Sequence, residues 1–206
     1  MYQFYEEGKL EIGIDEVGRG CLFGPVYSAG VIWLQEELDD NLNIKDSKKC
    51  SEKKRNYLYN YIKENAISYT IQSISNEDID KYNILESTYN CMHLCLDDIS
   101  SNIDYDTILV DGDKFRPYYN KYNGDFMKHI CVTGGDNKYK SIACASILAK
   151  VERDNYILKL CEEYPELKKY DIHNNKGYGT KKHIDAIKEY GITKWHRKTF
   201  GICKNY

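Results

Sequence analysis

Long apolar stretches and paired cysteine motifs are both absent from this 206-residue chain. No run approaches the roughly 18 consecutive apolar residues that a membrane-spanning helix needs. The N-terminus, MYQFYEEGKL, has neither the basic start nor the apolar core of a secretion signal. These absences predict an intracellular, cytoplasmic protein without a membrane segment. A hydrophobic content of 42% argues against disorder, and the length fits one domain, with room for a small appendage.

Cysteine occurs eight times, but never as a CxxC pair. Cys91 and Cys95 lie one helical turn apart among apolar residues, and Cys144 sits in a run of small residues. Such spacing argues against both a disulfide framework and a zinc site. The sequence therefore predicts reduced, mostly buried thiols.

An overall positive charge, the usual mark of a nucleic-acid-binding protein, is also lacking, because the net charge is -3. The charge is unevenly distributed, however. From residue 137 onward there are 15 Lys and Arg against 8 Asp and Glu, and residues 168–198 hold 9 basic against 3 acidic residues. This basic C-terminal region suits contact with a phosphate backbone, although a solvated lysine-rich helix would give the same count.

Hydrophobic patterning predicts an α/β domain with a mixed central β-sheet flanked by helices. The expected organisation is a main domain at 1–165 and a small basic helical cap at 166–206 packed on it, effectively one domain. We expect the first strands to form a meander and the later ones to alternate with helices. The predicted strands are 11–15, 26–34, 68–75, 107–111 and 129–133, and the predicted helices are 52–65, 76–100, 141–164 and 181–190.

Four carboxylates follow predicted strands: Asp15, Glu16, Asp111 and Asp136. Adjacent strand residues face opposite sides, so one of Asp15 and Glu16 is expected to face a site. Clustered carboxylates repel one another unless a proton or a hard cation lies between them, and oxygen ligands select Mg²⁺ or Mn²⁺ over zinc. Two such ions about 4 Å apart can bracket a phosphodiester. The pattern predicts hydrolytic phosphoryl chemistry on nucleic acid.

Five ordered blocks of sequence are similar to those of one enzyme family. They are GIDEVGRG (13–20) with Gly24-Pro25-Val26, DSKK (46–49), LVDGDKF (109–115), GGDNKYKSIACASILAKVERD (134–154), and HNNKGYGTKKHIDAI (173–187) with HRKTF (196–200). Through them the chain resembles ribonuclease HII, the type 2 ribonuclease H family, over nearly its whole length. The resemblance implies an RNase H-like fold and an endoribonuclease that hydrolyses RNA in RNA/DNA hybrids with two metal ions. It also implies cutting 5′ of single ribonucleotides embedded in duplex DNA, leaving 3′-hydroxyl and 5′-phosphate ends, for ribonucleotide removal.

The resemblance further implies roles for individual residues. The catalytic, metal-binding carboxylates would be Asp15, Glu16, Asp111 and Asp136. Gly18-Arg19-Gly20 is similar to the element whose backbone contacts the 2′-hydroxyl, although Arg19 itself could simply brace the turn. Tyr178 matches the tyrosine that stacks on the sugar after the ribonucleotide, and the residues expected to contact phosphates are Lys48, Lys138 and Ser141.

Several positions depart from the family pattern. Cys21 and Phe23 replace a usual proline and a small residue, which is expected to alter loop rigidity or the groove wall. Asp113 replaces a usual asparagine and adds a negative charge near the metals. The chain lacks room for the N-terminal domain of ribonuclease HIII and lacks a C-terminal clamp motif, so a minimal monomer is expected.

Three other interpretations stay open. The fold could bind hybrid duplexes without cleaving them, although four intact acids favour an enzyme. Another nuclease of the same fold, a type 1 ribonuclease H or a Holliday-junction resolvase, would not need GRG and KGYGTK together. An unrelated phosphate-binding or scaffold protein would make every matched block an accident. Asp154 is expected to form an ion pair on a helix surface rather than to bind a metal, and His173 and His196 are expected to be structural or to face phosphates.

Overall fold

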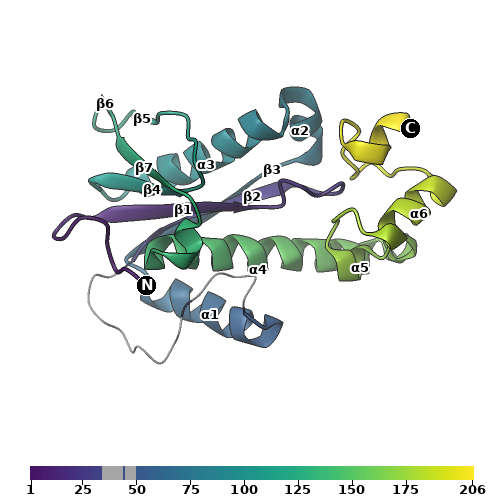
Figure 1. Cartoon of the computed structure of the whole chain (residues 1–206), viewed down its shortest axis with the longest axis horizontal. Helices are drawn as coiled ribbons and strands as arrows, with labels where there is room; N and C mark the ends of the chain where they lie inside the picture. The colour runs from purple at the N-terminus through teal and green to yellow at the C-terminus, as the bar shows by residue number, and fades with distance from the viewer. Residues whose placement is uncertain (34–43, 45–49) are drawn as a thin grey trace.

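The computed structural model describes residues 1–33, 44 and 50–206, and its centre is a five-stranded sheet (Figure 1). The strand order is β3-β2-β1-β4-β7. β1 pairs antiparallel with β2 and parallel with β4, β2 pairs antiparallel with β3, and β4 pairs parallel with β7. The mixed sheet predicted from the sequence is therefore confirmed. The strands are β1 (Glu11–Val17), β2 (Val26–Ile32), β3 (Ser68–Ile74), β4 (Thr107–Asp111) and β7 (Lys128–Val132), with β5 (Tyr119–Asn120) and β6 (Asp125–Phe126) forming a separate hairpin.

Helices cover both faces of the sheet (Figure 1). On one face lie α4 (Lys140–Glu163) and α1 (Glu52–Asn65), and on the other lie α3 (Ile84–Ser100) and α2 (Asn76–Tyr82). The small-residue start of α4 packs close to β1: a Cβ on Gly13 would lie 2.3 Å from the carbonyl carbon of Ser141. Only glycine allows this approach, because real Cβ atoms do not come so near a backbone atom.

The helix predicted over 76–100 is in fact two helices, and Asn83 divides them. Asn83 has a φ of 71°, a conformation that an α-helix cannot continue through. Its side chain accepts hydrogen bonds from the backbone N–H groups of Leu85 and Glu86, so it caps the start of α3. The periodicity of the two helices is continuous enough to hide this break.

The C-terminal region shares a hydrophobic core with the rest of the molecule. It contains the 3-10 helices η4 (Pro165–Tyr170) and η5 (Gly201–Asn205) and the helices α5 (Ile172–Asn175) and α6 (Lys181–Tyr190). Leu22 and Phe23 from the β1–β2 connection and Ile157 from α4 pack with Leu167 and Ile187 of this region. The predicted cap is thus held to the body by burial of apolar surface.

Most of the cysteines are buried, as predicted. They form no disulfide within the described part of the chain, and seven of the eight are buried. The thiols of Cys91 and Cys95 on α3 lie 3.2 and 3.4 Å from the backbone oxygens of Gln72 and Ser28. Among the described residues, no helix is both long and apolar enough to cross a membrane.

Candidate active site

The end of β1 divides its two acids between the two faces of the sheet. Ile12 and Ile14 pack towards α3, in the same core cluster as Met92. Asp15 points the other way, towards α4, where Ser146 hydrogen-bonds its carboxylate. The Glu16 backbone N–H also donates to Oδ1 of Asp15 at 2.7 Å. Asp15 is therefore buried, at 6% exposure, yet held by polar partners.

Glu16 faces a cavity of about 260 Å³ on the α3 side of the sheet. Its Oε1 accepts from Nη1 of Arg19 at 3.3 Å, and Arg19 is about half exposed. The first three turns of α3 form the opposite wall, which no local sequence pattern predicts. The cavity is lined by Glu16, Arg19, Leu85, Thr88, Tyr89, Met92, Asp111, Gly112, Asp113 and Lys114.

Asp111 enters the same cavity because β4 runs parallel to β1, with Val110 opposite Ile14. Parallel strands bring their carboxyl ends to one edge of the sheet. The backbone N–H of Gly135 donates to Oδ1 of Asp111 at 2.6 Å, which draws the 3-10 helix η3 (Gly135–Asn137) to this edge. Asp136 follows in η3, is buried, and accepts a hydrogen bond from the Asn137 side chain at 2.9 Å. The structure thus brings Asp15, Glu16 and Asp111 together, whereas Asp136 is connected to them through the preceding residue, Gly135, whose N–H donates to Asp111.

The pKa values of Asp15 and Glu16 are raised, so these two carboxylates resist ionisation. Burial raises the pKa of Asp15 well above the usual carboxyl range, and the negative charges of Glu16 and Asp111 raise it further. Burial also raises the pKa of Glu16, while the Arg19 guanidinium opposes the shift and Asp111 adds to it. Groups that repel one another in this way gain from a cation placed between them.

The donor chemistry of the site fits hard divalent cations. All four acids offer carboxylate oxygens, the ligands that Mg²⁺ and Mn²⁺ prefer. Within residues 1–33, 44 and 50–206, no three His, Cys, Asp or Glu side chains already form a metal-binding cluster. Among the described residues, Asp15, Glu16 and Asp111 are thus close enough to interact electrostatically, but they are not arranged as a finished coordination shell.

Two buried arginines, which the sequence analysis did not identify, donate hydrogen bonds to the Gly18-Arg19-Gly20 turn and to the segments around it. Arg153 of α4 donates to the backbone oxygens of Phe23, Pro25 and Lys176 at 2.8 to 3.0 Å. Arg197 donates to the oxygens of Arg19 and Gly24 at 2.9 Å. Both side chains are fully buried. The turn is consequently fixed to α4 and to the C-terminal region.

Within the turn, the three residues have different surroundings. Gly18 is buried at a φ of 93°, and a Cβ there would lie 2.3 Å from Nε of Arg153. Arg19 is exposed. A Cβ on Gly20 would meet none of the described atoms within 4 Å. The turn therefore presents its second and third residues outward, next to Glu16.

Tyr178 lies two residues after Lys176, in the loop whose Lys176 backbone oxygen accepts a hydrogen bond from Arg153. Its side chain is 39% exposed, and Nζ of Lys150 lies 5.9 Å from the centre of its ring. Lys150 also forms an ion pair with Asp154 at 2.8 Å, one helical turn along α4. Asp154 thus occupies a helix ion pair, in agreement with its expected role.

The three residues expected to contact phosphates have different outcomes. Lys48 lies outside the described residues. Lys138 is exposed two residues after Asp136. Ser141 is 4% exposed and packs against Gly13 at the start of α4. The serine that reaches Asp15 is Ser146, because α4 runs along β1 and places its second turn, not its first, at that level.

Cys21 and Phe23, which depart from the family pattern, are buried rather than on a groove wall. The Cys21 thiol is 3.9 Å from the backbone oxygen of Lys176. The Phe23 ring packs edge-on against His196, with centroids 5.1 Å apart. Both side chains help to join the turn to the C-terminal region.

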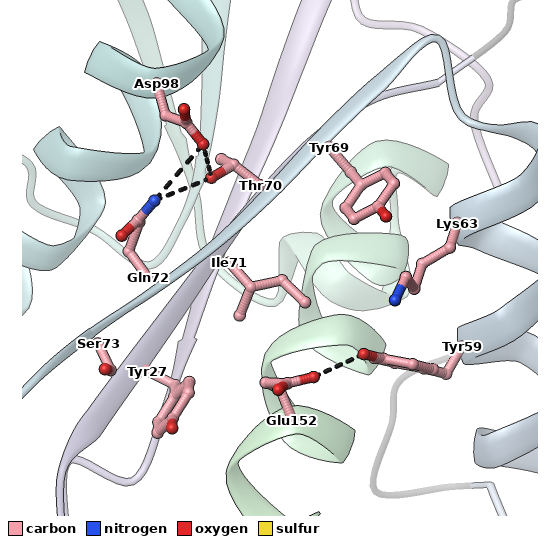
Figure 2. Close-up of a pocket in the computed structure, with 10 residues that line it drawn as sticks. All are labelled: Tyr27, Tyr59, Lys63, Tyr69, Thr70, Ile71, Gln72, Ser73, Asp98 and Glu152. Carbon is pink, nitrogen blue, oxygen red and sulfur yellow. Dashed lines mark hydrogen bonds between the residues drawn. The ribbon is translucent and has the colours of Figure 1, made fainter.

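A second cavity, about 630 Å³, lies beside β3, α1 and α4 and contains none of the expected site residues (Figure 2). Its two acids already have partners. Glu152 accepts from the Tyr59 hydroxyl at 2.5 Å, and Asp98 accepts from the Thr70 hydroxyl at 2.5 Å (Figure 2). Its size therefore does not make it the functional site.

Comparison with known proteins identifies the family. The chain matches the family model described as ribonuclease HII over residues 12–203. It is 44% identical over 202 residues to ribonuclease HII of Parabacteroides distasonis, covering 98% of this chain and 95% of that protein.

Solved structures agree with this match. Ribonuclease H2 from Pyrococcus horikoshii OT3 has a TM-score of 0.76 at 24% identity, covering 95% of both chains. The ribonuclease HII in the PCNA complex from Archaeoglobus fulgidus has a TM-score of 0.70 at 25% identity, covering 94% of this chain and 96% of that one. Bst-RNase HIII in complex with Mn²⁺ has a TM-score of 0.65 at 19% identity, covering 89% of this chain and 63% of that one. The fold is therefore the RNase H-like fold of the ribonuclease H2 type. The chain belongs to the ribonuclease HII family of metal-dependent endoribonucleases, which cleave RNA in RNA/DNA hybrids and remove embedded ribonucleotides.

Proposed function

We propose that Asp15, Glu16, Asp111 and Asp136 are the catalytic carboxylates and that together they hold two divalent cations, Mg²⁺ or Mn²⁺. The observation that carries this proposal is the convergence of acids from β1 and β4 at one sheet edge, where burial and mutual repulsion raise the pKa of Asp15 and Glu16 and where the Gly135 N–H of η3 donates to Asp111. The Mn²⁺ complex of the related Bst-RNase HIII supports it. Such ions, when bound, supply an activated water and stabilise the leaving oxygen.

The surrounding residues would hold the carboxylates ready for these ions. The Ser146 side chain and the Glu16 N–H orient Asp15, and the Gly135 N–H orients Asp111. The Arg19 guanidinium donates a hydrogen bond to Glu16 and would keep its carboxylate at the wall of the cavity. Preset ligands reduce the reorganisation that binding and reaction require.

We propose further that the enzyme cuts 5′ of a ribonucleotide embedded in duplex DNA and leaves 3′-hydroxyl and 5′-phosphate ends. The backbone of the Gly18-Arg19-Gly20 turn, whose second and third residues face outward, would contact the 2′-hydroxyl, the group that distinguishes RNA from DNA. Tyr178, half exposed on the neighbouring loop, would stack on the next sugar. Lys138 would contact a phosphate, and we assign the same role to Lys48 on the resemblance alone.

The basic region at 166–206 would act as the cap that holds the duplex, while 1–165 carries the acids. Lysines on this region would contribute salt-dependent affinity for phosphates. We also propose that the protein acts as an intracellular monomer on ribonucleotide-containing duplexes, as the resemblance implies.

The decisive experiment uses a labelled DNA duplex with one embedded ribonucleotide, incubated with Mg²⁺ or Mn²⁺, beside an all-DNA duplex. We expect a single cut 5′ of the ribonucleotide, none on all-DNA, and none after chelation. Asp111→Asn should lower the rate by more than about 100-fold while the duplex still binds. Asp125→Asn, an exposed acid on β6, is the matched control and should cut normally.

Other outcomes would separate the alternatives. Cleavage of long hybrids alone would indicate a hybrid-restricted nuclease. Tight binding without cleavage of either substrate would favour a catalytically silent protein. The Asp113→Asn protein tests the added charge, since Asp113 lines the same cavity as Asp111, and a metal profile equal to the parent would exclude an effect on metal choice.

A further inference from the structure

Two histidines are buried side by side beneath the loop that carries Tyr178. His183 lies in the first turn of α6, and His196 lies in the HRKTF segment. Neither side chain is exposed to solvent, and their Nε2 atoms are 3.0 Å apart. Buried polar nitrogens are rarely left without partners, so each ring nitrogen can be assigned from its neighbour.

The neighbours fix where the protons lie. His196 Nδ1 is 2.9 Å from the backbone N–H of Thr193, which can only donate, so this nitrogen is an acceptor. His183 Nδ1 is 2.9 Å from the backbone oxygen of Tyr178, which can only accept, so this nitrogen carries a proton. In two neutral rings, His196 Nε2–H must then donate to His183 Nε2. One continuous chain of hydrogen bonds therefore runs from Thr193 through both rings to Tyr178.

The environment keeps both rings neutral. Burial lowers the pKa of His183, and burial with the neighbouring His183 lowers the pKa of His196 to about 3. The aromatic ring of Tyr170 packs edge-on against both imidazoles. The charged groups nearby are Asp171, which acts on His183 from the turn before α5, and Arg197, which follows His196 in the chain.

The chain of hydrogen bonds ends at the backbone oxygen of Tyr178, whose backbone conformation sets the direction of the Tyr178 ring. The Tyr178 oxygen accepts from Thr180 N–H at 2.8 Å as well as from His183. On the preceding side, Gly177 has a φ of 87°, and a Cβ there would lie 2.8 Å from the Phe23 oxygen. The backbone is thus anchored while the ring remains partly exposed.

We propose that His183 and His196 are positioning residues that hold the Tyr178 backbone so that its ring meets the sugar at an RNA-to-DNA junction. Neither histidine touches the acids, so their effect is on substrate discrimination rather than on the chemical step. The inference rests on the proposed junction role of Tyr178 and adds the residues that set it.

The test compares two substitutions of His183 that differ in one donor. His183→Leu fills the space but removes the donor to the Tyr178 oxygen, whereas His183→Asn keeps an N–H near the Nδ1 position. The readout is kcat/KM on the single-ribonucleotide duplex divided by kcat/KM on a uniform RNA/DNA hybrid. We expect His183→Leu to lower this ratio about 10-fold, mainly through KM, and His183→Asn to restore most of it. Activity on the uniform hybrid reports that each variant is folded.

Tyr178→Ala and the double variant Tyr178→Ala/His183→Leu complete the test. If His183 acts through Tyr178, the double variant should be no worse than Tyr178→Ala. An equal loss on both substrates in His183→Leu would show a general structural role and overturn the proposal. If His183→Leu does not fold, His196→Asn, which keeps the Thr193 contact, must lower the same ratio, and an unchanged ratio overturns the proposal.

The same series separates this inference from the proposed function. If Tyr178→Ala leaves the ratio unchanged, the junction role of Tyr178 is wrong and the inference falls with it. If Tyr178→Ala lowers the ratio but His183→Leu and His196→Asn do not, only the inference is wrong.

Discussion

The buried guanidinium of Arg153 offers the sharpest test of how the substrate-facing turn is held. It donates to Pro25 O at 3.0 Å, Phe23 O at 3.0 Å and Lys176 O at 2.8 Å, and the side chain is fully buried. These three oxygens belong to the β1–β2 connection and to the Tyr178 loop. Replacing Arg153 by methionine keeps an unbranched side chain about as long as the aliphatic stem of arginine, but it removes the guanidinium and leaves all three oxygens without this donor.

The size of the effect follows from two opposing terms. Each hydrogen bond to a charged donor is worth about 1.5–3 kcal/mol, whereas removing a buried charge recovers part of its desolvation cost. Three buried or partly buried carbonyl oxygens left without a donor cost about 1–3 kcal/mol each, and the recovered desolvation of the guanidinium offsets part of that sum, so the net loss in the free energy of unfolding is about 3–5 kcal/mol. For a chain of this size, each kcal/mol lowers the melting temperature by about 2–4 °C. Arg153→Met should therefore melt about 6–20 °C below the parent.

Thermal melts followed by circular dichroism measure the shift. Arg116→Met is the matched control, because Arg116 is 39% exposed and pairs with Glu86 at 2.7 Å on the surface. An exposed ion pair contributes at most about 1 kcal/mol, so the control should fall by no more than about 4 °C. If Arg153→Met melts within the range of the control, the three hydrogen bonds do not stabilise the turn and the argument is wrong.

Three further predictions concern packing, pH and metal. Gly13→Ala should lower the free energy of unfolding by about 3 kcal/mol, because the added Cβ would lie 2.3 Å from the carbonyl carbon of Ser141. Denaturant melts measure this loss, and a loss under about 1 kcal/mol would contradict the close contact between β1 and α4. The pKa of His196 is lowered to about 3 in the folded state. Its contribution to stability is therefore complete above about pH 6.5, the pKa of histidine in the unfolded chain. As the pH falls below about 6.5, the unfolded chain takes up the proton and the free energy of unfolding drops by about 1.4 kcal/mol per pH unit. The stability of His196→Gln should therefore fall less steeply between pH 6.5 and 5 than that of the parent, and parallel curves would refute this. Mn²⁺ at about 100 times its Kd should add about 2.7 kcal/mol to the stability of the parent but not of Asp15→Asn, and equal shifts would place the metal elsewhere.

The sequence predicted the sheet strands and the acids because these depend on local patterns. The apolar run TILVD ends at Asp111, and GIDEVGRG ends β1 with two acids, so each strand could be predicted together with its candidate site residue. The ordered motifs then identified the family, which the match over residues 12–203 confirms. The helix start at Ser51 was also predictable, since the cap and its N–H partner on Lys54 are three residues apart.

The tertiary structure alone decided which polar residues support the site. Arg153 and Arg197 lie in segments whose composition indicates surface, because arginine is rarely buried, and only the oxygens of distant loops show why they are inside. The pairing of His183 with His196 likewise depends on a contact between residues 13 positions apart.

Helix α4 shows most clearly what local sequence patterns cannot predict. Its sequence gives a long helix with a small-residue face, and the resemblance gives Ser141 as a phosphate contact. Its direction along β1 places Ser146, and not Ser141, at the level of Asp15. Local periodicity determines which residues form an element and which face is apolar. The position of one element along another is determined by packing between segments that are distant in the sequence, here the close approach of Gly13 to Ser141. That packing exists only in the folded chain.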